Sequence, residues 1–142
     1  MKNILILNGP NLNLLGIRQM DIYGDKLLDE IIAELQSTFT GHNIVHRQSN
    51  HEGVLIDLLH EYGFSYDGIV LNAGAYTHTS LALADAVRSI TSPVIELHIS
   101  DIYKREPFRA HSYLKDVCLS QIVGKGTEGY AIAVAQFLGQ GH

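Results

Sequence analysis

The sequence has only one cysteine, Cys118, so no disulfide can form within the chain. A lone cysteine fits a reducing compartment, and its ordinary role is that of a small buried apolar side chain. Basic residues are also few: the chain has 10 Lys and Arg but 15 Asp and Glu, which gives a net charge of −5. A nucleic-acid binder would carry a basic surface, so we expect no nucleic-acid partner.

Long apolar runs are missing as well. The apolar run near the N-terminus ends at Asn8, too early for the core of a signal peptide. No segment approaches the roughly 20 apolar residues of a transmembrane helix. We therefore expect no membrane association and a cytoplasmic location. The 142 residues, 46% of them apolar, suit one globular domain, which we place at residues 1–142.

Strand-like and helix-like segments alternate along the chain. Apolar runs or alternating patterns predict strands at residues 3–7, 44–48, 68–71, 93–99 and 117–123. Apolar residues at helical spacing predict helices at residues 28–39, 55–62, 79–89 and 129–138. This alternation calls for parallel pairing through crossover helices. We predict an α/β, flavodoxin-like, doubly wound five-stranded parallel sheet with strand order 2-1-3-4-5.

In such a sheet, ligands bind beyond the carboxyl ends of the strands, where the strand order reverses. The segments that follow the first, third and fourth predicted strands are NGPN, NAG and HIS, and all three are polar. The sequence therefore predicts a polar crevice at this edge.

The segment that runs from Asn8 to Gly24 places Arg18 five residues before Tyr23. Tyrosine has a pKa near 10, so it needs a nearby positive charge to act as a base at neutral pH. A guanidinium about 4 Å away supplies interaction energy of the required size. Tyr23 is thus a candidate general base with Arg18 as its activator. On spacing alone, an incidental Tyr and Arg on a surface loop is the favoured explanation.

His98 and Glu96 lie two apart on a predicted strand, so their side chains leave the same face. A nearby carboxylate favours the imidazolium and orients the ring, which suits a general acid; the alternative is a structural histidine at a strand end. Ile99 and Ser100 follow, and their N–H groups and hydroxyl can hold a carboxylate. Farther on, Arg105 and Arg109 could clamp polar groups or lie on the surface.

The NAGAYTHTS segment forms a third polar cluster. In it, Asn72 and His78 can donate or accept hydrogen bonds without net charge, and Gly74 permits close approach of the backbone. We interpret Thr77, Thr79 and Ser80 as helix caps. Asp85 follows His78 by seven residues, so the two could share a helix face, from which Asp85 reaches a ligand, a neighbouring subunit or only solvent.

Two motifs suggest cofactors but fail on context. GKGTEG, residues 124–129, matches a dinucleotide-binding pattern, yet too few residues follow for the acidic ribose partner. We interpret it as a tight strand-to-helix turn. The eight histidines, from His42 to His142, show no metal-binding spacing, so we expect neither metal nor cofactor.

Several motifs together closely resemble the type II 3-dehydroquinate dehydratases. They are NGPNLNLLGIRQMDIYG, QSNHEG, LNAGAYTHTS, IELHIS, REPFRAHS and IVGKGTEGY, and they occur in collinear order over nearly the whole chain. The resemblance implies a flavodoxin-like fold and a lyase that removes water from 3-dehydroquinate to give 3-dehydroshikimate, without cofactor or metal. It implies a place in the shikimate pathway of aromatic amino acid biosynthesis, and it is equally compatible with quinate breakdown. The family is typically a dodecamer of four trimers, which implies a homododecamer here.

The resemblance also implies roles for individual residues. Tyr23 takes the proton, Arg18 activates it, Asn11 stabilises the enolate through a water, and His98 protonates the departing hydroxyl. The residues that match substrate-contact positions are Asn72, His78, Asp85, Ile99, Ser100 and Arg109, with Ile99 and Ser100 on the carboxylate. Arg105 matches a family arginine with no assigned role. Gln19-Met20 replaces the usual Glu-Pro after the loop arginine, a difference that bears on the stiffness of the loop.

Two other readings are open at this stage. One is a flavodoxin-like receiver or flavin-binding module without lyase activity. A receiver, however, would carry Asp at the strand ends where Asn8 and Asn72 stand. The other is a non-catalytic scaffold that retains the fold.

Overall fold

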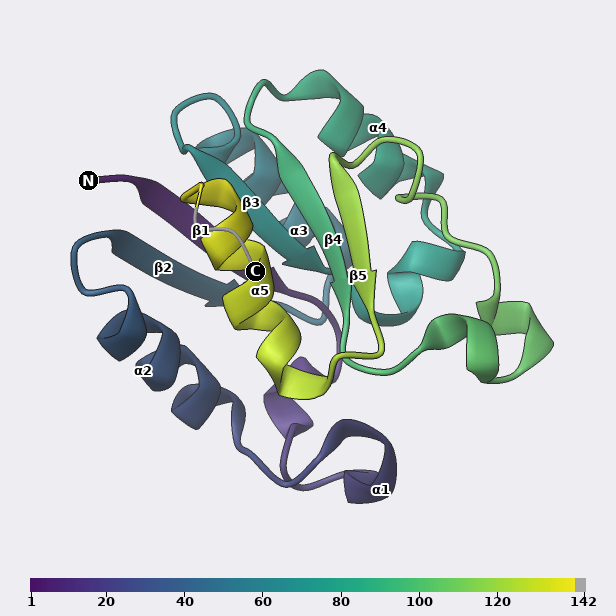
Figure 1. Cartoon of the computed structure of the whole chain (residues 1–142). Helices are drawn as coiled ribbons and strands as arrows, with labels where there is room; N and C mark the ends of the chain where they lie inside the picture. Colours follow the sequence, from purple (N-terminus) through teal and green to yellow (C-terminus); the bar gives the residue numbers. More distant parts are fainter. Residues whose placement is uncertain (140–142) are drawn as a thin grey trace.

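The first apolar run forms β1 (Asn3–Asn8), and its side chains Ile4 to Leu7 are fully buried. In this computed structural model, which describes residues 1–139, β1 pairs with β2 (Asn43–Gln48) and with β3 (Gly68–Asn72). β4 (Val94–His98) and β5 (Ser120–Val123) complete a parallel sheet of order β2-β1-β3-β4-β5 (Figure 1). The predicted strand order is confirmed.

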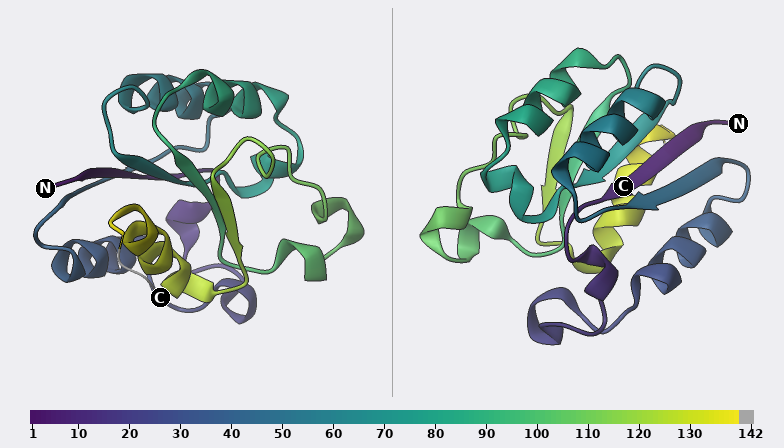
Figure 2. Two further views of the ribbon diagram at one scale, coloured as in Figure 1. Left: turned by 45° about the horizontal axis from the view of Figure 1, so that its top comes forward. Right: turned by 180° about the vertical axis from the view of Figure 1, so that it is seen from behind.

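Helices cover both faces of the sheet (Figure 2). α2 (Leu28–Thr38) and α5 (Gly129–Phe137) pack on one face, and α3 (Glu52–Tyr62) and α4 (Leu81–Ser89) pack on the other. Alternate residues of β1 supply the two cores: Ile4 and Ile6 face α2 and α5, whereas Leu5 and Leu7 face α3 and α4. A strand buried on both faces is why the first run is continuously apolar.

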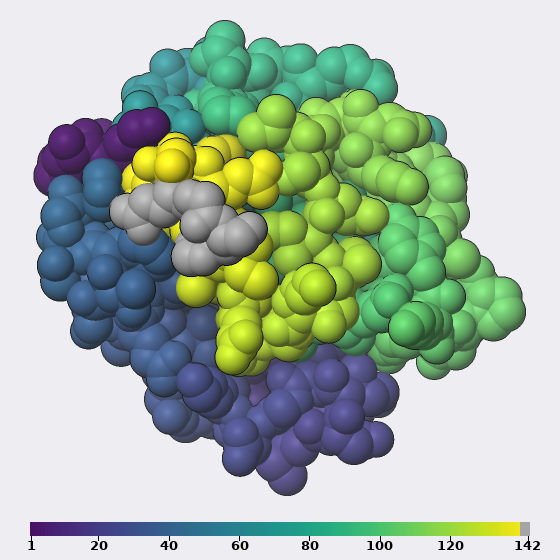
Figure 3. Space-filling model, viewed as in Figure 1, coloured from purple at the N-terminus to yellow at the C-terminus, as the bar shows by residue number. Residues whose placement is uncertain are grey.

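Short helical turns fill the loops at the carboxyl edge of the sheet. They are η1 (Leu12–Leu14), α1 (Met20–Tyr23), η2 (Gly74–His78), η3 (Ile102–Lys104), η4 (Pro107–Arg109) and η5 (Gly126–Glu128). The β1–α2 loop, residues 9–27, protrudes at the bottom of the molecule, beside the turn that precedes α5 (Figure 3). The GKGTEG segment is indeed a strand-to-helix turn, with Gly124 and Gly126 at positive φ.

Three boundaries differ from the predictions by two or more residues. The second helix begins at Glu52 and not at residue 55. The fifth strand begins at Ser120 and not at residue 117, because Val117 and Cys118 form a turn on the carbonyl of Leu114. Their side chains pack against the core beneath α4, so their apolar character reflects packing outside a strand. The third predicted helix begins at Leu81, where the Ser80 hydroxyl accepts from the N–H of Leu83 at 2.9 Å. Ser80 is therefore the predicted cap.

Candidate active site

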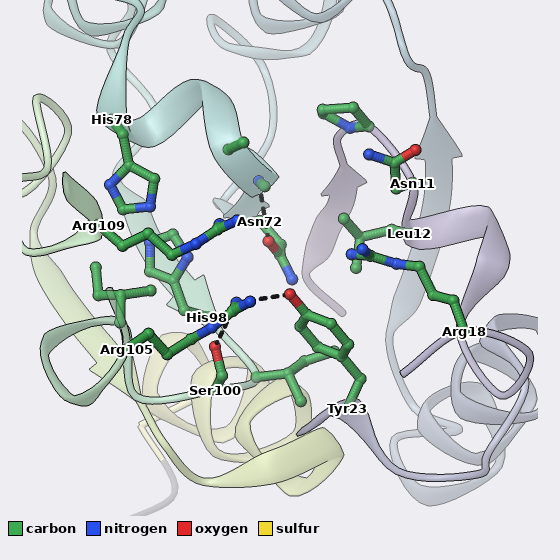
Figure 4. Close-up of a pocket in the computed structure, with 15 residues that line it drawn as sticks. Asn11, Leu12, Arg18, Tyr23, Asn72, His78, His98, Ser100, Arg105 and Arg109 are labelled. Atoms are coloured by element: carbon green, nitrogen blue, oxygen red, sulfur yellow. Dashed lines mark hydrogen bonds between the residues drawn. The ribbon is translucent and has the colours of Figure 1, made fainter. Parts of the chain in front are cut away.

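The predicted crevice lies at the carboxyl ends of β1, β3 and β4 (Figure 4). All predicted site residues except Asp85 line one pocket. Its lining residues are Pro10, Asn11, Leu12, Arg18, Tyr23, Asn72, Gly74, Ala75, His78, His98, Ile99, Ser100, Ile102, Arg105 and Arg109. The topology thus brings together side chains that are far apart in the sequence.

Close backbone approach joins the loops after β1 and β3. The N–H of Gly9 donates to the carbonyl of Asn72 at 2.7 Å, and a Cβ on Gly9 would lie 2.6 Å from the Ala73 carbonyl oxygen. Only glycine fits at this position. The side chain of Asn72 is held as well, since its Oδ1 accepts from the N–H of Gly74 at 3.1 Å. These contacts set the floor of the pocket.

Tyr23 projects into the pocket from α1, between two guanidinium groups. Arg105 donates from Nη1 to the phenol oxygen at 2.7 Å. Arg18 lies over the ring, with Cζ 4.5 Å from the ring centroid. The phenol of Tyr23 thus lies beside two positive charges. The sequence pointed to Arg18 as the activator, but in this structure Arg105 makes the direct hydrogen bond.

Arg18 has unused hydrogen-bonding capacity at the pocket wall. Its Nη1 donates to Gln19 at 3.2 Å. Its buried Nε has no hydrogen-bond partner in the described part of the chain. Gln19 adopts a left-handed backbone with φ 40° at the N-cap position of α1, and its side chain makes no capping hydrogen bond. Asn11, on the same wall, is also left-handed, with φ 69°.

His98 stands at the end of β4 and is backed by Glu96. The Nε2 atom of His98 lies 2.6 Å from Oε2 of Glu96. Because a carboxylate only accepts, this nitrogen carries a proton. Ser112 and Thr77 donate their hydroxyls to the same oxygen at 2.6 and 2.7 Å, and Gln121 donates to Oε1 at 3.1 Å.

The Glu96 carboxylate is fully buried but well paired. Burial raises its pKa, but the hydrogen bond and charge of His98, with the Ser112 and Thr77 hydroxyls, outweigh burial and leave the pKa below its ordinary value. A buried carboxylate that stays ionised fixes the ring of His98 through its hydrogen bond. Sequence reasoning found Glu96 and His98 but missed Ser112 and Gln121, which come from separate segments. It interpreted Thr77 as a helix cap, whereas in the structure the Thr77 hydroxyl binds Glu96 and Ser80 is the cap.

His78 lies beside His98, with the ring centroids 6.4 Å apart and the planes at 19°. Its Nδ1 lies 2.7 Å from the carbonyl of His111 and must therefore donate. Burial lowers the pKa of His78, and the nearby His98 and Arg109 act in the same direction. The hydrogen bond to His111 opposes this shift without reversing it, and in the neutral ring with its proton on Nδ1, Nε2 is an acceptor.

The Ile99–Ser100 segment is held from behind by the glycine turn. The carbonyls of Ser100 and Ile99 accept from the N–H groups of Gly124 and Gly126, each at 3.1 Å. Arg105 reaches the Ser100 hydroxyl at 3.5 Å. The motif that resembled a dinucleotide site therefore supports the pocket from outside.

Asp85 is the exception among the predicted residues. It is exposed on α4 and accepts from Arg88 at 3.4 Å. It does not share a helix face with His78, because His78 ends η2 and Ser80 caps a new helix. Within one chain it lies outside the pocket.

Other sequence features have structural roles or lie elsewhere. Burial, and secondarily the charge of Glu96, raises the pKa of the Cys118 thiol to about 12, which makes it unreactive. Among residues 1–139, no three His, Cys, Asp or Glu side chains converge as metal ligands. His142 lies outside the described residues. Over the described range, no helix has both the length and the apolar character to cross a membrane.

Comparison with known proteins settles the family. A family model described as Dehydroquinase class II matches residues 2–138. The chain belongs to the class II dehydroquinases. Among its relatives, the 3-dehydroquinate dehydratase of Bacillus pumilus is 50% identical, with 99% of this chain and 97% of that protein covered. The catabolic 3-dehydroquinase of Phaeosphaeria nodorum is also 50% identical, covering 94% and 89%.

The fold agrees with this class II dehydroquinase assignment. The crystal structure of a type II dehydroquinase from Butyrivibrio crossotus superposes with a TM-score of 0.93 at 42% identity. The alignment covers 96% of this chain and 97% of that one. The family and the fold expected from the sequence motifs are both confirmed.

Proposed function

We propose that this class II dehydroquinase removes water from 3-dehydroquinate to give 3-dehydroshikimate, without a cofactor. The observation that carries the proposal is the pairing of two groups in one pocket. A phenol flanked by two guanidiniums forms one wall, and a histidine backed by a buried carboxylate stands at another. A base and an acid of this kind are what an elimination beside a ketone requires.

In this mechanism, Tyr23 acts as a phenolate and takes a proton from the carbon next to the ketone. The electron pair left on carbon moves toward the ketone oxygen and forms an enolate. Asn11 stabilises that oxygen through an ordered water, as preorganised donors do for developing negative charge. When the enolate collapses, the carbon–oxygen bond on the opposite face breaks and His98 protonates the departing hydroxyl, which leaves as water. Afterwards Tyr23 releases the proton that it took to solvent, and His98 takes a proton from solvent, so both groups return to their starting forms.

The other lining residues bind the substrate. The N–H groups and hydroxyl at Ile99 and Ser100 hold the carboxylate. Asn72, His78 and Arg109 contact the ring hydroxyls. Arg105 and Arg18 share the stabilisation of the phenolate, Arg105 through its hydrogen bond and Arg18 through its position over the ring. The free Nε of Arg18 is a further donor on this wall.

We further propose a cytoplasmic homododecamer built as four trimers, with no nucleic-acid or membrane partner. The exposed face of α4 supports the assembly, because Leu81 is 62% exposed there beside Asp85. In a trimer, Asp85 would meet the pocket of a neighbouring subunit and not its own. Gel filtration tests this assembly: a dodecamer is expected, and a monomer with full activity would contradict it.

A direct assay tests the activity. When 3-dehydroquinate is added to the purified protein, ultraviolet absorbance of the conjugated enone product should rise. Treatment with a chelator should leave the rate unchanged. Correctly folded protein that produces no enone signal would sink the proposed function.

A further inference from the structure

Tyr130, at the start of α5, is buried behind the pocket and takes no part in the mechanism above. Its side chain is fully buried, and its hydroxyl lies between the ends of β1 and β3. The hydroxyl donates to Oδ1 of Asn8 at 2.6 Å and accepts from Nδ2 of Asn72 at 3.2 Å. Asn8 in turn reaches Nε2 of His46 at 3.1 Å. A chain of hydrogen bonds therefore runs from His46 beneath the sheet edge to the pocket floor.

The direction of every bond in this chain follows from one backbone group. The N–H of Gly74 can only donate, so the atom of Asn72 that faces it is the oxygen. The amide nitrogen of Asn72 then faces Tyr130, whose oxygen accepts. The single proton of the Tyr130 hydroxyl must go to Asn8.

The same reasoning extends to the far end of the chain. Because the oxygen of Asn8 accepts from Tyr130, its nitrogen donates to Nε2 of His46, which must be unprotonated. His46 is thus neutral, with its proton on Nδ1. Burial lowers the pKa of His46, with Asp29 acting in the opposite direction, and this agrees with the neutral form.

This arrangement limits what Asn72 can offer to a ligand. Its Oδ1 is engaged by Gly74, and one of its two N–H bonds is engaged by Tyr130. One N–H is left for the pocket that Asn72 lines. A bound molecule therefore meets Asn72 as a donor, and it must place an oxygen with a free lone pair there.

We propose that Tyr130 is a positioning residue that holds the Asn72 amide with one N–H directed at an oxygen of the substrate, a hydroxyl or a carbonyl. The proposal rests on the proposed function only for its kinetic readout. Without the Tyr130 hydroxyl, the Asn72 amide loses the partner that opposes Gly74, and Asn8 loses its donor. Loss of the hydroxyl should therefore affect catalysis through Asn72 and not through the fold as a whole.

The test is a double-mutant cycle in the full chain. Tyr130→Phe removes only the hydroxyl, and Asn72→Ala removes the group that it holds. We expect Tyr130→Phe to lower kcat/KM about five- to tenfold, the loss of one buried hydrogen bond. In the Asn72→Ala background, the same substitution should change kcat/KM less than about twofold, because residues in one network are not additive. Tyr62→Phe is the matched control, since its hydroxyl binds Arg47 on the surface, and it should be indistinguishable from the original chain.

A purely structural role for Tyr130 predicts a different result. It would lower kcat/KM by the same factor in both backgrounds, and that result, or no loss in either, would overturn the proposal. Inactivity of the original chain would instead count against the proposed function. If the original chain is inactive, or if Tyr130→Phe does not fold, side-chain amide hydrogen exchange measured by NMR tests the proposal instead. The Nδ2 protons of Asn72 should exchange much more slowly than those of exposed Asn50, and equal rates would overturn the assignment of Tyr130.

Discussion

The two sides of the pocket that carry the acid and the base are built differently. His98 ends a strand, is 5% exposed, and is fixed by a carboxylate that accepts four hydrogen bonds. Tyr23 ends a single helical turn inside the β1–α2 loop and is only half-buried. One hydrogen bond, from Arg105, joins its hydroxyl to the rest of the molecule.

In the proposed mechanism, this contrast divides the work of catalysis between the sheet and a loop. The sheet and Glu96 hold the proposed acid, His98, in a fixed orientation. The proposed base, Tyr23, stands on a loop, the kind of element whose movement in enzymes admits substrate and excludes water. Changes to Glu96 or His98 should therefore affect stability and rate together, whereas changes to Tyr23 and the arginines beside it should affect rate with little effect on stability.

The largest effect is expected for Tyr23→Phe, which removes the base and leaves the ring. We expect kcat to fall by about 10³-fold, within the range for loss of general acid–base catalysis, with KM nearly unchanged. Steady-state kinetics and thermal unfolding provide the measurements, and the unfolding temperature should not change. Substantial turnover by this variant would rule out Tyr23 as the base.

Glu96→Gln should come next and should affect both properties. The side-chain NH2 group of glutamine can only donate, so it cannot accept the hydrogen bonds that His98 and the two hydroxyls donate to the carboxylate. We therefore expect a loss of about 1–3 kcal/mol in unfolding free energy. We expect kcat to fall by about 10²-fold, because His98 loses its orienting charge. Glu34→Gln, which disrupts an exposed ion pair with Lys26, is the matched control, and it should leave unfolding free energy and kcat nearly unchanged.

The pH dependence of stability sharpens this prediction. The pKa of Glu96 is depressed in the folded state, so its contribution is complete above the ordinary value of 4.5 and is lost as pH falls through the folded value. Urea unfolding at a series of pH values below 4.5 should show less acid sensitivity in Glu96→Gln than in the original chain. Equal sensitivity would mean that Glu96 is not the group that titrates.

The two arginines beside Tyr23 should differ in importance. Arg105→Met removes a charge-assisted hydrogen bond to the phenol, and we expect kcat to fall about 10- to 100-fold. Arg18→Met removes a cation over the ring, for which we expect about a two- to fivefold loss. Arg47→Met on the surface is the control. The reverse order of effects would show that substrate brings Arg18, and not Arg105, to the phenol oxygen.

Gln19→Asn should have the smallest effect. Gln19 is left-handed at φ 40°, a conformation that Asn adopts more readily. We expect a gain of up to about 0.5 kcal/mol in unfolding free energy and kcat within about twofold. Calorimetry measures the change in stability, and steady-state kinetics measure kcat. A large change in kcat would mean that the backbone at Gln19 controls the approach of Tyr23.

Much of the fold and of the pocket lining could be predicted from the sequence alone, because the signals for them are local. Continuous apolar strands, helical spacing and a serine cap predicted the sheet and the crevice at its edge. Asp85 illustrates the limit of such reasoning. The spacing argument placed it on one helix face with His78, although the predicted cap at Ser80 begins a new helix between them. One chain by itself shows only that Asp85 is exposed and outside the pocket.

The partners of the predicted residues could not be found in this way. Arg105 and Tyr23 are 82 residues apart, and Tyr130 and Asn8 are 122 apart. A polar residue at the start of the apolar final helix was the only sign of Tyr130. The sequence by itself determined the strand order, the polar residues that follow the strand ends, and the family. Only the tertiary structure decided which groups tune them, because those contacts form where loops from distant strands meet at one edge.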